Sequence, residues 1–189
     1  ELNAFGPDVV GTNCVTMNFK QAAGILSIVK QTFPEVITLM GGPHVSFDAE
    51  NTLCFFQGID IIVKGEGEAT VTELLGVIHS PEKWHTIPGI VFKDQGQIIT
   101  TAPRPFIQDL DALPLPARHL LPMARYQALG YPVSIITSRG CPNQCIFCLG
   151  RRMVGQKVRF RSAGHIADEI EQIISLGISV INIADDLFT

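Results

Sequence analysis

Short apolar runs alternate with amphipathic segments along the first part of the chain. The runs end in glycine or small polar residues and predict buried strands over 7–13, 36–40 and 59–63. Helices are predicted between them, over 18–33, 48–56 and 69–79. Asn18 is a candidate cap of the first helix, and Thr70 and Glu73 have the spacing of a capping box. Strands that alternate with helices imply a parallel sheet covered on both faces.

The pattern changes after Pro88. Two apolar runs, 89–93 and 97–101, flank Asp94-Gln-Gly96 and predict a β-hairpin. Residues 103–132 then hold six of the twelve prolines. Proline fixes φ and removes a backbone donor, so this segment predicts an extended linker with one helical turn near Arg118. We therefore expect a first domain over 1–102, a linker over 103–132 and a second domain over 133–189.

The last segment predicts a single strand–helix–strand unit. An apolar strand at 133–136 leads into a cysteine-containing loop, and a second strand is expected over 178–184. Between them Ser162 can cap a helix that ends at Gly177. Its apolar stripe consists of Ile166, Ile170, Ile173 and Ile174.

The composition is that of an ordinary α/β protein, with 46% hydrophobic residues and a formal net charge of −4. No apolar stretch approaches the length of a membrane span, and the start at Glu1 has neither the basic residues nor the apolar core of a signal peptide. Five cysteines, three of them in one motif, favour a reducing cytoplasmic location. Cys14 and Cys54 lie among apolar neighbours and are expected to be small buried residues.

One basic run stands out against the acidic balance. Residues 151–161 carry five positive charges in eleven positions. Such a run can bind a polyanion, but it can also be a solvated loop or pair with nearby carboxylates. The net negative charge argues against general nucleic-acid binding.

The sharpest chemical signal is the spacing Cys141-x-x-x-Cys145-x-x-Cys148. Thiolates that converge from one tight loop suit a 4Fe-4S cluster, and three of them leave one iron open to another ligand. A structural zinc site normally needs four ligands, for which His165 is the nearest later candidate and no second cysteine pair exists. A disulfide framework is typical of short secreted chains.

This motif resembles the signature of the radical S-adenosylmethionine enzymes, including an aromatic residue, Phe147, before the third cysteine. The resemblance implies that S-adenosylmethionine chelates the open iron and is cleaved reductively to a 5′-deoxyadenosyl radical. Asp185 and Asp186 stand where that family commonly has a Gly-Gly-Glu-like motif that binds the amino group of S-adenosylmethionine. Arg161, in the basic run, is a candidate for its carboxylate.

The first domain resembles the cobalamin-binding domain that precedes many of these enzymes. Asn13-Cys14-Val15 occupies the place of a Ser-x-Leu pattern, Gly41-Gly42 follows, and Gly65-Glu66 comes after the third strand. The resemblance implies that Asn13, Val15, Gly41, Gly42, Gly65 and Glu66 contact cobalamin. The Asp-x-His-x-x-Gly loop that presents a cobalt-ligating histidine is absent from the sequence, and His44 is interpreted as a turn residue.

Together these features predict a Rossmann-like (flavodoxin-like) parallel-sheet domain followed by the first βαβ unit of a truncated (β/α)6 barrel. The expected activity is S-adenosylmethionine cleavage with cobalamin-dependent methyl transfer to an unreactive carbon of a small molecule or peptide, supplied with electrons by a flavodoxin or ferredoxin type of donor. A cobalamin-independent oxidoreductase with a scaffold domain, and a non-catalytic metal- or RNA-binding module, are the alternatives. Because further barrel strands are missing, we expect the fragment to be inactive alone and to self-associate through 133–189.

Overall fold

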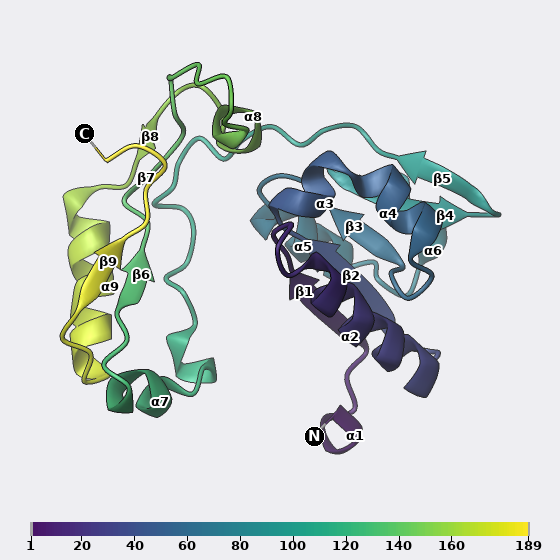
Figure 1. Cartoon of the computed structure of the whole chain (residues 1–189), viewed down its shortest axis with the longest axis horizontal. Helices are drawn as coiled ribbons and strands as arrows, with labels where there is room; N and C mark the ends of the chain where they lie inside the picture. Colours follow the sequence, from purple (N-terminus) through teal and green to yellow (C-terminus); the bar gives the residue numbers. More distant parts are fainter. Residues whose placement is uncertain (1, 189) are drawn as a thin grey trace. The chain divides into compact units, whose positions relative to one another are not determined.

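The computed structural model describes residues 2–188 and divides into two compact units between Phe106 and Ile107 (Figure 1). Each unit has its own sheet and its own hydrophobic core. Within the described residues, no helix is long and apolar enough to cross a membrane.

The first unit contains a five-stranded sheet in the order β1-β2-β3-β4-β5. β1 (Val9–Asn13), β2 (Ile37–Gly41) and β3 (Ile61–Val63) run parallel, and the hairpin of β4 (Ile90–Asp94) and β5 (Gln97–Thr100) joins antiparallel. The expected parallel α/β sheet and the hairpin are therefore both present. In the hairpin turn, Gln95 and Gly96 have positive φ, which the Asp-Gln-Gly sequence tolerates.

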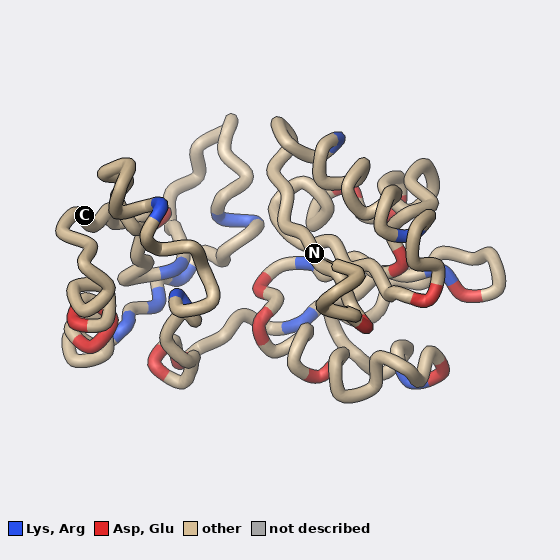
Figure 2. The backbone as a smooth tube through the Cα atoms, turned by 90° about the horizontal axis from the view of Figure 1, so that it is seen from below, with Lys and Arg blue, Asp and Glu red and all other residues tan. Residues whose placement is uncertain are grey.

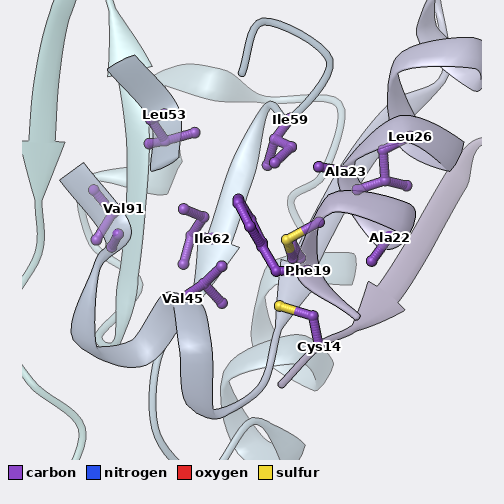
Figure 3. Packing of buried hydrophobic residues seen from close by; sticks show 12 residues of the cluster. Cys14, Phe19, Ala22, Ala23, Leu26, Val45, Leu53, Ile59, Ile62 and Val91 are labelled. Carbon is purple, nitrogen blue, oxygen red and sulfur yellow. The ribbon is translucent and has the colours of Figure 1, made fainter. Parts of the chain in front are cut away.

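Helices cover both faces of this sheet. A short α1 (Leu2–Phe5) precedes β1. On one face, α2 (Phe19–Thr32), α3 (Pro43–Phe47) and α4 (Ala49–Phe55) pack on a cluster that includes Cys14, Phe19, Leu26, Met40 and Ile62 (Figure 3). On the other face, α5 (Glu68–Leu75) and α6 (Pro81–Trp84) pack on Leu39, Ile61, Val63, Ile90 and Phe92. Neighbouring strand residues point to opposite faces, which is why uninterrupted apolar runs form these strands.

Three local predictions for the first unit are wrong. Asn18 occupies the N-cap position of α2, but its side chain accepts a hydrogen bond from the Val15 N–H in the preceding turn. Thr70 lies inside α5 and donates to the Pro88 carbonyl, so it forms no capping box with Glu73, which pairs with Arg104. Cys54 is exposed on α4, whereas Cys14 is buried, and burial raises the pKa of the Cys14 thiol.

The second unit is a strand–helix–strand motif. β6 (Val133–Ile135) pairs in parallel with β9 (Ile181–Ile183), and α9 (Ala163–Ser175) connects them as a crossover. Ser162 caps α9 as predicted, with its Oγ accepting from the His165 N–H. Ile173 is fully buried, but Ile174 is exposed, so the apolar stripe is narrower than expected.

The loop between β6 and α9 has its own small elements. β7 (Ser138–Arg139) pairs antiparallel with β8 (Arg159–Phe160), and α8 (Gly150–Val154) lies between them in the sequence. The cysteine motif falls inside this ribbon, between β7 and α8.

Residues 107–132 group with the second unit, and the helical turn expected near Arg118 is present. They include a 3-10 turn (Arg118–Leu120) and α7 (Met123–Ala128), and bury Leu110, Arg118 and Met123. Asp111 also accepts hydrogen bonds from the Ser162 N–H, at the start of α9. Hydrogen bonding to the Ser162 side chain, and then to its N–H, lowers the pKa of the Asp111 carboxyl group. Apolar and charged anchors between the prolines therefore fix a segment that lacks long regular elements.

A buried ionic group connects this segment to α9. Glu169 is 1% exposed, and one of its carboxylate oxygens lies 2.5 Å from Nη2 of Arg118. The other oxygen accepts from Arg161, whose guanidinium also donates to the Ile136 carbonyl at 2.8 Å. Two cations and one carboxylate are thus shielded from water together, so removing the carboxylate leaves both cations without their partner.

We predict that Glu169→Ala lowers the free energy of unfolding of the second unit by about 3–5 kcal/mol, because two buried guanidinium groups lose their counter-ion. The exposed Glu171 on the same helix provides the control: Glu171→Ala should change stability by less than about 0.5 kcal/mol. Urea unfolding followed by circular dichroism measures the effect. Fluorescence of Trp84, which lies in the first unit, should be nearly unaffected, and equal shifts in both signals would contradict the assignment.

Candidate functional site

The carboxyl ends of the parallel strands carry the residues expected to bind cobalamin. Asn13 ends β1 and is paired in register with Gly41, the last residue of β2. The two loops also touch just after the strands end, where the Cys14 N–H donates to the Gly41 carbonyl at 3.0 Å. The first two predicted loops are therefore brought together at one edge of the sheet, the usual ligand-binding edge of an open parallel sheet.

The conformation and close packing of these two loops require a glycine at position 42. Its φ is +101°, and a Cβ at this position would collide with the Asn13 side chain and lie 2.8 Å from the Cys14 nitrogen. A side chain would therefore displace the β1 loop. The Gly-Gly sequence consequently has a structural reason here, independent of any ligand.

The third loop is joined to the second by a residue that the sequence analysis did not single out. The Ser46 hydroxyl donates to the Gly42 carbonyl at 2.9 Å and accepts from the Gly65 N–H at 3.0 Å. Ser46 thus sets the separation between the two glycine loops. Its only sequence signal is its position four residues after Gly42, in the first turn of a short helix.

Bare backbone remains available along this edge. A Cβ at Gly65 would meet nothing within 4 Å, and one at Gly41 would meet only the Val63 carbonyl, at 3.8 Å. The Val15 side chain is 46% exposed in the β1 loop. Glycine backbone without covering side chains allows a large, flat ligand to approach closely, so the edge fits the nucleotide portion of a cobalamin.

His44 has other contacts. Its ring lies 4.1 Å from that of Phe19, and its Nδ1 is 3.2 Å from the Thr16 hydroxyl. These contacts agree with its interpretation as a turn residue of the first unit.

The cysteine loop leaves the second unit at the corresponding strand end. Gly140, with φ +114°, precedes Cys141, and a Cβ there would lie 2.9 Å from the carbonyl carbon of Lys157. The Cys141 N–H donates to the Gly155 carbonyl at 3.0 Å, which closes the base of the loop. The ribbon therefore holds the start and the end of the loop side by side.

The three thiols differ in exposure but lie in one loop. Cys141 is half-buried, and Cys145 and Cys148 are exposed. The Gly150 N–H is directed at the Cys148 sulfur, at 3.3 Å, as backbone amides are around cluster-bound thiolates. Within residues 2–188 no three metal-binding side chains converge on a single ion.

The two aspartates at the end of β9 have different environments. Asp185 accepts hydrogen bonds from the Thr137 N–H, the Thr137 hydroxyl and the Ser138 hydroxyl, at 2.6, 2.5 and 2.8 Å. Burial raises the pKa of Asp185, but these hydrogen bonds outweigh it and the pKa is lowered overall. Asp186 is exposed.

The other two residues expected to bind S-adenosylmethionine, Phe147 and Arg161, also differ in their exposure. Phe147 is 87% exposed on the cysteine loop. Arg161 is turned inward, where it pairs with Glu169 and donates to the Ile136 and His165 carbonyls. The guanidinium group of Arg161 is therefore already engaged within the second unit.

In the second half of the basic run over 151–161, the arginines make hydrogen bonds within the protein. Arg159 is buried and donates to the Ile107 and Val154 carbonyls. Residues 112–167 contain eight Lys or Arg and no Asp or Glu. Some of these cations pair with carboxylates outside that range, as Arg118 and Arg161 do with Glu169. Figure 2 marks the charged residues along the backbone.

Comparisons with known proteins agree with this geometry. The B12 binding domain model matches residues 1–75. A protein described as an uncharacterized methyltransferase from Pyrococcus horikoshii is 36% identical over 190 residues, which covers 100% of this chain and 41% of the relative. The anaerobic magnesium-protoporphyrin IX monomethyl ester cyclase of a Synechocystis species is 32% identical over 161 residues, covering 84% of this chain and 32% of the relative.

A solved structure has the same fold. The cobalamin-dependent S-adenosylmethionine radical enzyme OxsB, with aqua-cobalamin and S-adenosylmethionine bound, superimposes with a TM-score of 0.85 at 22% identity, over 99% of this chain and 26% of that chain. This chain thus spans less than half the length of each of these relatives.

We predict that Gly42→Ala destabilises the first unit by about 1–3 kcal/mol, because alanine adds the strain of a positive φ to a collision with the β1 loop. Gly24→Ala is the matched control, since a Cβ there meets nothing within 4 Å and alanine is favoured in a helix by about 1 kcal/mol. Urea unfolding monitored by Trp84 fluorescence measures both. A Gly42→Ala protein as stable as the parent would show that the loop does not need this glycine.

Proposed function

Since the chain belongs to the radical S-adenosylmethionine enzymes that carry a B12-binding domain, we propose that it forms the cofactor-binding part of a cobalamin-dependent member of that family. The observation that carries the proposal is the pairing of two sites on one chain. Glycine loops gather at the carboxyl edge of a B12-type sheet, and a three-cysteine loop leaves the carboxyl end of a following βαβ unit.

In this proposal Cys141, Cys145 and Cys148 hold a 4Fe-4S cluster, and S-adenosylmethionine binds beside it. When bound, these cofactors supply one-electron cleavage of S-adenosylmethionine, and cobalamin supplies a transferable methyl group. The chain itself holds the cysteine loop in place, through the turn at Gly140 and the β7–β8 ribbon. It also directs the Gly150 N–H at the Cys148 sulfur.

Cobalamin is assigned to the edge formed by the loops after β1, β2 and β3. Val15, Gly41 and Gly65 present exposed or bare positions there, and Ser46 fixes the distance between the glycine loops. Asn13 and Gly42 form the packed base of the same edge. Glu66 follows Gly65 in the third loop and is assigned to the same edge.

Methyl transfer is the reaction that we favour, because the Pyrococcus relative, which matches the chain from end to end, is described as a methyltransferase. The cyclase relative favours a second candidate, in which the chain serves closure of a ring in the substrate without addition of a methyl group. Transfer of isotope-labelled methyl from S-adenosylmethionine to product distinguishes them. The substrate is a small molecule or peptide, and a flavodoxin or ferredoxin type of protein supplies the electron.

We predict that anaerobic incubation with iron and sulfide gives a brown protein with a broad absorption shoulder near ~400 nm, as thiolate-bound clusters do. Alanine at Cys141, Cys145 or Cys148 should abolish the absorption. Cys14→Ala and Cys54→Ala serve as controls, since one thiol is buried in the first unit and the other lies on α4. Stoichiometric tetrahedral zinc with no iron uptake under any condition would refute the cluster assignment.

For cobalamin, we predict that Val15→Glu weakens binding of hydroxocobalamin about tenfold or more, because it adds negative charge at the edge assigned to a cofactor that carries an anionic phosphate. Ile28→Glu, at an exposed position of α2, adds the same charge to the same unit and should leave the affinity unchanged. Equilibrium dialysis measures the affinity, and Trp84 fluorescence verifies folding. Equal affinity of both variants and the parent would place the ligand elsewhere and favour the scaffold alternative.

A further inference from the structure

The start of the cysteine loop is held by one carboxylate from a distant part of the sequence. Asp185 follows β9, yet both of its oxygens are used by Thr137 and Ser138, which connect β6 to the loop. Ser138 is buried, and Cys141 follows only three residues later. The three donors come from one backbone N–H and two hydroxyl groups, so the carboxylate fixes both the main chain and the side chains at this point.

The opposite side of the same backbone is also fixed. The Arg161 N–H donates to the Thr137 carbonyl at 2.9 Å, and Ser138 pairs with Phe160 in the β7–β8 ribbon. Residues 137–138 are therefore hydrogen-bonded to Asp185, just after β9, on one side and to the end of the β7–β8 ribbon on the other. The direction in which the chain enters the cysteine loop depends on this double attachment.

We propose that Asp185 is a positioning residue that orients the cysteine loop. This rests on the proposed function. Neighbouring residues at the end of a strand point in different directions, so Asp185 is turned toward Thr137 while Asp186 is exposed. Asp186 is therefore the matched control for Asp185.

The chemistry of the contact explains why an acidic residue is needed. Three donors converge on Asp185, and an ionised carboxylate is the only side-chain group that accepts at both of its heavy atoms without donating. The hydrogen bonds also lower the pKa of Asp185, so the group is ionised at neutral pH. An amide can replace the shape but presents one donor where an acceptor is needed.

The test compares Asp185→Asn with Asp186→Asn in the protein, first without cofactors. Hydrogen exchange across residues 137–149 should become about tenfold faster in Asp185→Asn, the effect of losing a charge-assisted hydrogen bond. Asp186→Asn should exchange like the parent. Thr137→Val removes the partner hydroxyl and should resemble Asp185→Asn, whereas Thr137→Ser keeps that hydroxyl and should resemble the parent.

The second readout uses the reconstituted cluster. Asp185→Asn and Thr137→Val should each change the electron paramagnetic resonance spectrum of the reduced cluster in the absence of S-adenosylmethionine. The double variant should change this spectrum no more than either single variant does. Asp186→Asn, the matched control, should leave that spectrum unchanged.

The inference is overturned if Asp185→Asn leaves both hydrogen exchange and the cofactor-free spectrum unchanged while weakening S-adenosylmethionine binding, because Asp185 would then be a direct contact. Failure of the parent protein to take up iron would instead refute the proposed function. The exchange experiment would still decide whether Asp185 holds the loop.

Discussion

Parallel pairing of strands is the constraint on which both sites depend. Parallel strands need crossover connections, so every strand of such a sheet presents its following loop at the same edge. In the first unit this gathers the loops after Asn13, Gly41 and Val63, which lie 22 or more residues apart in the sequence. In the second unit the pairing of β6 with β9 brings Thr137 and Asp185 together. Local loop chemistry then decides what each edge can bind.

The regular elements were largely predictable from the sequence because their signals are local. Continuous apolar runs, the Asp-Gln-Gly turn and Ser162 before an isoleucine-rich segment each specify structure within a few residues. The B12-type sheet, the hairpin and the capped helix followed from them. The cysteine spacing was equally local, and its loop lies at a strand end as expected.

The rest depended on contacts between distant residues. Nothing near Thr70 indicates that Arg104 and Pro88 will take its hydroxyl group. The proline-rich segment looked like a linker because the partners of Asp111 and Arg118 lie about 50 residues downstream. Likewise, nothing in the basic run indicates that Arg161 pairs with Glu169. Which charged residues pair with one another inside a fold depends on its tertiary packing. The periodicity of hydrophobic residues in the sequence does not indicate these pairs.

The attachment of Thr137 to Asp185 also sets an order of events during synthesis. The two residues are 48 positions apart, and a chain made from its amino terminus exposes all three cysteines well before β9 exists. Until α9 has crossed over and β9 has paired, the cysteine loop has only its β7–β8 ribbon to shape it. The thiols are therefore available to oxidants before the loop that carries them has its final shape, so correct folding depends on the nascent chain remaining reduced over that interval.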